Sequence, residues 1–84
     1  MAAEKLKTTI RKEQIVEAAL EVIAAQGVRG LSVSRVARRV GLVPSAIYRH
    51  FKGKQEVLDA VVSLIERRLM ENVALVEKQE AEVI

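Results

Sequence analysis

The sequence predicts an all-α fold, in which three helices form a small domain and a long fourth helix follows them. Apolar residues recur every three or four positions over most of the chain, as they do on one face of a helix. The glycines and the single proline fall between these periodic stretches, where helices usually end or begin. We therefore expect helices at about residues 9–26, 33–40, 44–51 and 54–80, and no strand.

The first helix is expected to begin at Thr8 or Thr9, since either hydroxyl can cap it, and to end before Gly27. Its apolar stripe consists of Ile15, Ala18, Ala19, Val22 and Ile23. Gly30, in the connector that follows, suggests a further residue with positive φ. Residues 1–8 precede this helix as an N-terminal arm, which we expect to be loosely ordered.

Two short helices joined by a tight turn come next, and the rest of the chain is organised around them. Ser32 is placed to cap the first of them. Its buried face consists of Val33, Val36, Ala37 and Val40. Gly41 ends it, because glycine adopts a left-handed conformation without steric cost. Pro44 suits the first position of the next helix, whose buried side is formed by Ile47 and Phe51. Together these features describe a helix-turn-helix unit.

The fourth helix is predicted to begin at Lys54, with Gly53 as an acceptable cap. Its inward stripe consists of Val57, Leu58, Val61, Leu64, Ile65 and Leu69. No helix breaker follows, so the helix can continue beyond what a three-helix domain needs. The apolar residues of that continuation are Met70, Val73, Leu75, Val76, Val83 and Ile84. Nothing in this chain is expected to cover them, which calls for a second copy or a further domain.

The charge distribution indicates the kind of partner. Between Val22 and Gln55 there is no acidic residue, whereas basic residues occur at Arg29, Arg35, Arg38, Arg39, Arg49, Lys52 and Lys54. The whole chain carries a net charge of only +3, because 14 basic residues are offset by 11 acidic ones. A basic block that coincides with a helix-turn-helix indicates contact with a nucleic-acid backbone, and a merely solvated basic face is the alternative.

Composition argues against several other classes of function. One histidine, one aspartate and no cysteine leave too few groups for an active site or a metal site. We therefore expect neither enzymatic activity nor a cofactor. No apolar run approaches the roughly 18 residues of a membrane span, so no membrane partner is expected. The lack of cysteine suits a reducing cytoplasm.

From about Arg11 to Leu69 the chain resembles the N-terminal DNA-binding domain of the TetR family of transcriptional regulators. The resemblance is carried by Ile15, Ala18, Ala19, Gly27, Leu31, Ser32, Val33, Val36, Ala37, Val40, Gly41, Leu42, Ile47, Tyr48, His50, Phe51, Lys54 and Leu58. The chain departs from the family pattern at Val43, where a small hydroxyl residue usually caps the recognition helix. On this basis we expect a DNA-binding domain at residues 9–69, after the arm, and a helical extension at residues 70–84.

The resemblance implies a sequence-specific regulator of transcription, usually a repressor, that binds a palindromic operator in double-stranded DNA. It also implies that the small-molecule effector site and most of the dimer interface belong to a C-terminal half outside this chain.

Residue roles also follow from the resemblance. It places a recognition helix at residues 44–51 in the major groove. Arg49 is the candidate for bidentate guanine recognition, with a further phosphate contact as the alternative. Ser45 can bond to a base edge or a phosphate, and Pro44 and Ala46 can pack on a thymine methyl group. The expected backbone contacts are Ser34, Arg35, Tyr48, His50 and Lys54. Lys5 and Lys7 in the arm are weaker candidates.

A different class of function is a helical interaction module that associates through residues 54–84 without nucleic acid. The uncovered apolar surface beyond Met70 favours it. Salt dependence separates the two hypotheses, because DNA binding weakens steeply with salt and apolar association does not. For the DNA-binding hypothesis we expect a weak homodimer, since the gain from burying the tail and the cost of association are of similar size.

Overall fold

A computed structural model describes residues 2–83 of the chain, and the side chains of residues 5–82. Its elements are α1 (Ala2–Gln26), the short 3₁₀ helix η1 (Val28–Gly30), α2 (Val33–Val40), α3 (Pro44–Tyr48) and α4 (Lys54–Val83). Residues 2–83 contain no strand, so the predicted all-α class is confirmed.

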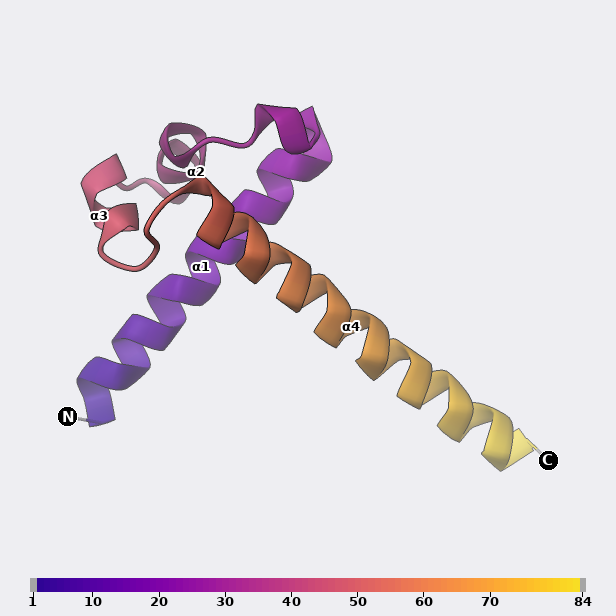
Figure 1. The fold of residues 1–84 in the computed structure, drawn as a ribbon. Coiled ribbons are helices and arrows are strands. Elements are labelled where there is room, and N and C mark those ends of the chain that lie inside the picture. Colours follow the sequence, from indigo (N-terminus) through magenta and orange to yellow (C-terminus); the bar gives the residue numbers. More distant parts are fainter. Residues whose placement is uncertain (1, 84) are drawn as a thin grey trace.

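The two long helices cross, and the short ones lie on one side of the crossing (Figure 1). The first turns of α4 pack against the middle of α1, while α2 and α3 lie close to the crossing. The N-terminal part of α1 and the C-terminal part of α4 then extend away from the domain in different directions (Figure 1). The domain therefore exposes long stretches of both helices.

The hydrophobic core is assembled from all four α-helices. Its buried members are Ile15, Val16, Ala18, Ala19, Val22, Leu31, Val33, Val36, Ala37, Ile47, Phe51, Val57 and Val61. The stripe predicted for the first helix is therefore buried, apart from Ile23, which packs half-buried against the core. Among the described side chains the core contains no polar residue, so burial costs no unpaired polar group there.

The predicted boundaries of the helix-turn-helix unit are confirmed at three positions. The Ser32 hydroxyl accepts a hydrogen bond from the backbone N–H of Arg35, at 3.1 Å, and so caps α2. Gly41 ends α2 in the left-handed region with a φ of 81°. Pro44 occupies the first position of α3, as its fixed φ favours. Before the unit, Gly27 follows the end of α1 with a φ of 76°.

The prediction of a positive φ at Gly30 is wrong, because a different constraint requires glycine there. A Cβ added at Gly30 would lie 2.6 Å from Cβ of Gln26 and 3.2 Å from Nη1 of Arg35. Gly30 therefore permits a close approach between η1 and the end of α1, rather than an unusual backbone conformation.

Three helix boundaries differ from the prediction. Helix α1 begins at Ala2, so residues 2–8 continue it and neither Thr8 nor Thr9 caps it. The Thr9 hydroxyl instead donates to the carbonyl of Lys5, and most of the preceding residues are good helix formers. Helix α3 ends at Tyr48 instead of residue 51, and α4 runs to Val83.

The predicted inward stripe of α4 is wrong in its second half. Val57 and Val61 are buried, and Leu58 and Leu64 are half-buried. Ile65 and Leu69, by contrast, are 40% and 58% exposed. Each step of four residues advances about 40° beyond a full helical turn, so a four-residue series rotates away from the core. At the same time α4 leaves the domain (Figure 1).

Two adjacent valines on α4 provide a matched test of this packing. Val61 is 1% exposed and Val62 is 46% exposed. We expect Val61→Ala to lower the free energy of unfolding by about 2 kcal/mol, since two buried methyl groups are lost and a cavity remains. Val62→Ala should change it by less than about 0.5 kcal/mol. Urea denaturation followed by circular dichroism measures both, and equal losses would contradict the packing described.

Candidate nucleic-acid interface

Helix α3 presents its polar side outward because its apolar side is fixed in the core. Ile47 is fully buried, whereas Ser45, Tyr48 and Arg49 are exposed and Ala46 is half-buried. Tyr48 is the chain's only tyrosine, and 54% of it is accessible to solvent. An aromatic ring with a hydroxyl left in solvent is available for a ligand.

Helix α3 begins without a capping side chain. Val43 makes no side-chain cap, and the first turn is closed by a backbone bond from Ala46 N–H to the Val43 carbonyl at 2.9 Å. Pro44 is exposed at the first helical position. Its missing N–H removes one of the donors that a cap would otherwise have to satisfy.

The turn between α3 and α4 carries further candidate residues. The backbone N–H groups of His50 and Phe51 both donate to the Ile47 carbonyl, at 2.9 and 3.0 Å. Phe51 is buried and anchors this turn, while His50 is half-buried. Lys54 follows at the first position of α4 with an exposed side chain. His50 and Lys54 therefore both lie after the end of α3, one in the turn and one at the start of α4.

The environment of His50 is electropositive. Burial lowers the pKa of the His50 imidazole below its ordinary value of 6.5, and the positive charges of Lys12, Arg11 and Arg49 lower it further. Two of these cations, Arg11 and Lys12, belong to α1, and both line the same surface hollow as Phe51 of the turn after α3. The charged imidazolium is disfavoured here unless an anion joins the cluster.

Arg35, on α2, has a structural contact that its charge alone does not reveal. Its Nη1 donates to Oε1 of Gln26 at 2.7 Å and to the Gly30 carbonyl at 2.9 Å. The guanidinium thus ties α2 to the end of α1 and to η1. Ser34, the other candidate on this turn of α2, is exposed.

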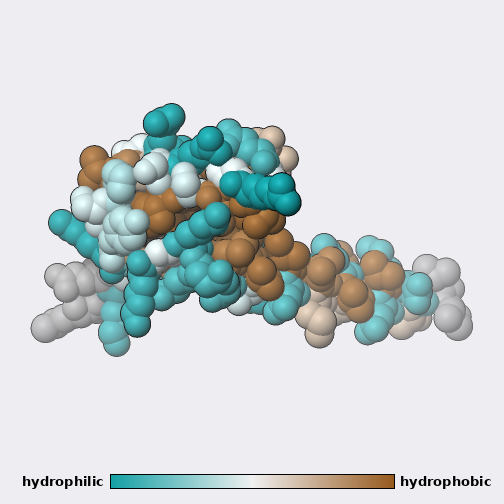
Figure 2. All heavy atoms as spheres, turned by 45° about the horizontal axis from the view of Figure 1, so that its top comes forward, coloured by the Kyte–Doolittle hydropathy of each residue, from teal (hydrophilic) through white to brown (hydrophobic). Residues whose placement is uncertain are grey.

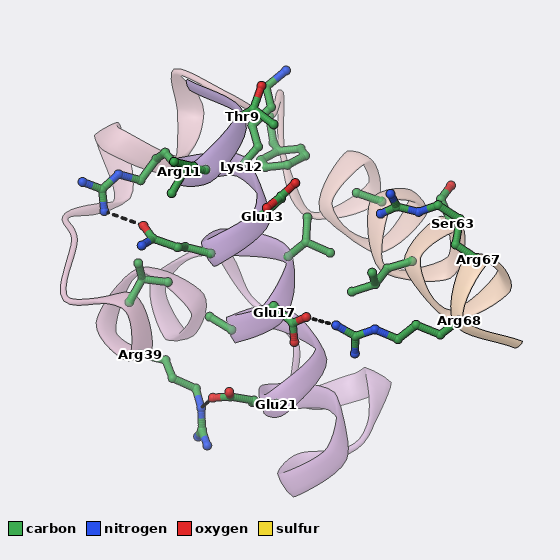
Figure 3. A pocket seen from close by; sticks show the side chains of 18 of the residues that line it. Thr9, Arg11, Lys12, Glu13, Glu17, Glu21, Arg39, Ser63, Arg67 and Arg68 are labelled. Atoms are coloured by element: carbon green, nitrogen blue, oxygen red, sulfur yellow. Dashed lines mark hydrogen bonds and ion pairs between the residues drawn. The ribbon is translucent and has the colours of Figure 1, made fainter. Parts of the chain in front are cut away.

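An open groove lies in the angle between α1 and α4 (Figure 3). Two ion pairs cross between elements there. Arg39 of α2 contacts Glu21 with 2.7 Å between Nε and Oε2, and Arg68 of α4 contacts Glu17. These half-exposed ion pairs link α1 to α2 and to α4, and such charged groups are not typical of the largely apolar lining of a small-molecule site. Within residues 2–83, no helix combines the length and apolar character that a membrane span requires.

Tyr48, Arg49 and His50 follow one another in the sequence at the end of α3, and the structure adds two residues that the sequence did not single out. These are Arg11 and Lys12, whose charges act on His50. Their signal in the sequence is a short stretch, residues 5–12, in which basic residues occur without an acidic one. The net charge of the chain outside the helix-turn-helix does not reveal this stretch, because acidic residues elsewhere offset its four basic ones.

Known proteins share this arrangement of helices. The family model described as bacterial regulatory proteins, tetR family, matches residues 15–61, which is more than half of the chain. The chain belongs to the TetR family.

Relatives named as HTH-type transcriptional regulators match about three quarters of the chain. The chain is 45% identical over 62 residues to TtgW of Pseudomonas putida, named an uncharacterized HTH-type transcriptional regulator. This match covers 74% of the chain and 44% of TtgW. The HTH-type transcriptional regulator SrpR of Pseudomonas putida is also 45% identical over 62 residues, covering 74% of the chain and 28% of SrpR.

A solved structure agrees in fold. The fatty acid degradation regulator FadR from Bacillus halodurans superposes with a TM-score of 0.68 at 30% identity. The match covers 76% of this chain and 34% of FadR. The chain thus spans less than half the length of these TetR-type proteins.

The contact between Arg35 and Gln26 can be measured by a double-mutant cycle. Gln26→Ala and Arg35→Ala, alone and together, should reveal a coupling of about 1 kcal/mol in the free energy of unfolding. Arg38 lies on the same helix and makes no hydrogen bond or ion pair among the side chains of residues 5–82. The same cycle with Arg38→Ala should give no coupling. Zero coupling for Arg35 would show that its bond to Gln26 adds no stability and would leave the bond to the Gly30 carbonyl as its structural contact.

Proposed function

We propose that this chain binds double-stranded DNA sequence-specifically as the DNA-binding part of a transcriptional regulator, acting as a repressor in the cytoplasm. The observation that carries the proposal is the side of α3 that faces solvent. It presents Tyr48 and Arg49 beside a half-buried His50, in a region of the chain without acidic residues. A solvated basic face would not require an exposed tyrosine at this place.

Base recognition in this proposal is the task of α3. Arg49 is exposed at the end of the helix and can donate two hydrogen bonds to a guanine. Ser45 is exposed in the first turn and can bond to a base edge or a phosphate. Pro44 and Ala46 offer small apolar surfaces to a thymine methyl group.

Phosphate contacts flank the recognition helix on both sides. Tyr48 offers a hydroxyl, and Lys54 offers an ammonium at the positive end of α4. His50 can join them as an imidazolium once a phosphate is close. On the other side, Ser34 is exposed in the first turn of α2. Arg35 can contribute its remaining N–H groups while Nη1 stays bonded to Gln26 and Gly30.

Two copies of the chain would then bind a palindromic operator, because a single recognition helix reads only a few base pairs. An exposed apolar stripe on α4 supports a contact between copies (Figure 2). It consists of Val62, Ile65, Leu69, Val73 and Val76. A small-molecule effector would act through the part of the TetR-type relatives that this chain does not span.

The base-reading role of Arg49 has a direct test. Selection of bound sequences from random duplex DNA should yield two inverted half-sites. On the selected sequence, Arg49→Ala should relax the preference at one base pair by about 1–3 kcal/mol, the value of one bidentate contact. The control Arg29→Ala removes an exposed arginine of η1 and should leave base preferences unchanged. An equal loss for Arg49→Ala on selected and random DNA would make Arg49 a backbone contact.

The pH dependence of binding tests His50. In the free protein its pKa lies below 6.5, and a bound phosphate would raise it by stabilising the imidazolium. DNA binding should then take up a proton, so affinity should rise as the pH falls from about 7.5 to 5.5, by at most about tenfold per pH unit.

The variant His50→Gln should remove this rise, at constant salt. Stability follows the opposite sign, because the unfolded state binds the proton more readily and the folded chain loses stability below about pH 6.5. Identical pH profiles for both proteins would exclude a phosphate contact by the imidazolium of His50.

The association between copies is expected to be weak. Burying about 400 Å² of the α4 stripe would contribute about 10 kcal/mol. Association costs about 4–15 kcal/mol, so the dissociation constant should be micromolar or higher. Sedimentation at about 10 μM measures this, and Leu69→Glu should abolish the dimer. A nanomolar, salt-independent dimer without DNA binding would instead support a helical interaction module built on α4.

A further inference from the structure

The N-terminal part of α1 forms a second basic stretch, separate from the helix-turn-helix. Residues 5–12 contain Lys5, Lys7, Arg11 and Lys12 and no acidic residue. All four side chains are exposed. The acidic residues of α1 that follow are Glu13, Glu17 and Glu21, two of which are paired with arginines of other helices. Positive charge thus predominates in the N-terminal half of the helix, between Glu4 and Glu13.

This basic stretch lies on the side of α1 that faces the rest of the domain. The positions 5, 8, 12, 15, 19 and 22 are three and four apart and share one face of a helix. Over Ile15, Ala19 and Val22 this face is buried in the core. Further toward the N-terminus the same face carries Lys12 and Lys5, beyond the edge of the core.

The neighbours of Arg11 and Lys12 connect this stretch to the recognition helix. Both residues line the surface hollow shown in Figure 3. Phe51, in the turn after α3, lines the same hollow. Arg11 and Lys12 also act electrostatically on His50, together with Arg49. Cations from two separate elements therefore act on the same imidazole, while Glu17 and Glu21 of the hollow are already paired with arginines. A phosphate near His50 would be attracted by these cations.

We propose that Arg11 and Lys12, with Lys5 further out, bind the phosphate backbone of the DNA next to the base pairs that α3 reads. The inference rests on the proposed DNA-binding function and extends it to a second element of the fold. The first turns of α1 then serve as a backbone clamp that lengthens the contacted duplex without adding base recognition.

The test compares two double variants of equal charge. Arg11→Gln with Lys12→Gln removes two cations from the clamp. Arg29→Gln with Lys78→Gln removes two exposed cations, one from η1 and one from the C-terminal part of α4, neither of which lines the hollow shared by Arg11, Lys12 and Phe51. Affinity is measured over a salt series on the selected duplex, both as a minimal site and extended by about ten base pairs, one helical turn, at each end.

If Arg11 and Lys12 bind the DNA backbone in this way, three results are expected. The unsubstituted chain binds the extended duplex more tightly than the minimal one. The Arg11/Lys12 variant loses that gain, binds at least tenfold more weakly, and shows a salt slope smaller by about 1.8, since each phosphate contact contributes about 0.9. The Arg29/Lys78 variant keeps the length gain and nearly the same slope as the unsubstituted chain.

Two further measurements separate the possible failures. The charge-preserving variant Arg11→Lys with Lys12→Arg should restore the salt slope, and circular dichroism should show that every variant remains helical. An unchanged slope and length gain in the Arg11/Lys12 variant would overturn the clamp while leaving DNA binding by α3 intact. A lack of salt-dependent binding to any duplex by the unsubstituted chain would overturn the proposed function itself.

Discussion

The burial of Ile47 and Phe51 is the constraint on which the presentation of α3 depends. Helix α3 has only five residues, and a helix of that length does not hold its conformation or its direction alone. Its position comes from Ile47, which is fully buried, and from Phe51, which is buried in the following turn. Because these two side chains point into the core, Tyr48 and Arg49 must point into solvent. The hydrophobic core thus holds α3 in place and leaves its polar side, with Tyr48 and Arg49, exposed to solvent.

The local signals in the sequence were sufficient to predict the helix-turn-helix unit. Ser32, Gly41 and Pro44 each act on their own backbone or on the adjacent turn, so their effect is visible in a short window of sequence. The apolar spacing then fixes which side of each helix is buried. For these reasons α2 and the start of α3 were predicted to the residue.

Features that depend on tertiary structure could not be predicted in the same way. Periodicity along α4 does not indicate where the helix leaves the domain, so Ile65 and Leu69 were wrongly assigned to its inward stripe. Glycine at position 30 could equally signal a positive φ or a close approach, and only the position of Gln26 decides between them. Charge alone likewise did not show that Arg35 bonds to Gln26, nor that the charge of Arg11 acts on His50. The roles of the site residues toward DNA remain predictions.

The most direct test of the proposed function locates the DNA on the protein without any substitution. A ¹⁵N-labelled chain is titrated with the selected duplex at low salt, and amide resonances are followed by NMR. The largest changes should fall within residues 44–54, with smaller ones near Arg11 and Lys12, while α4 beyond Met70 should respond only where two copies meet. Changes concentrated in the groove between α1 and α4, with residues 44–54 unaffected, would contradict the assignment of α3 as the reading helix.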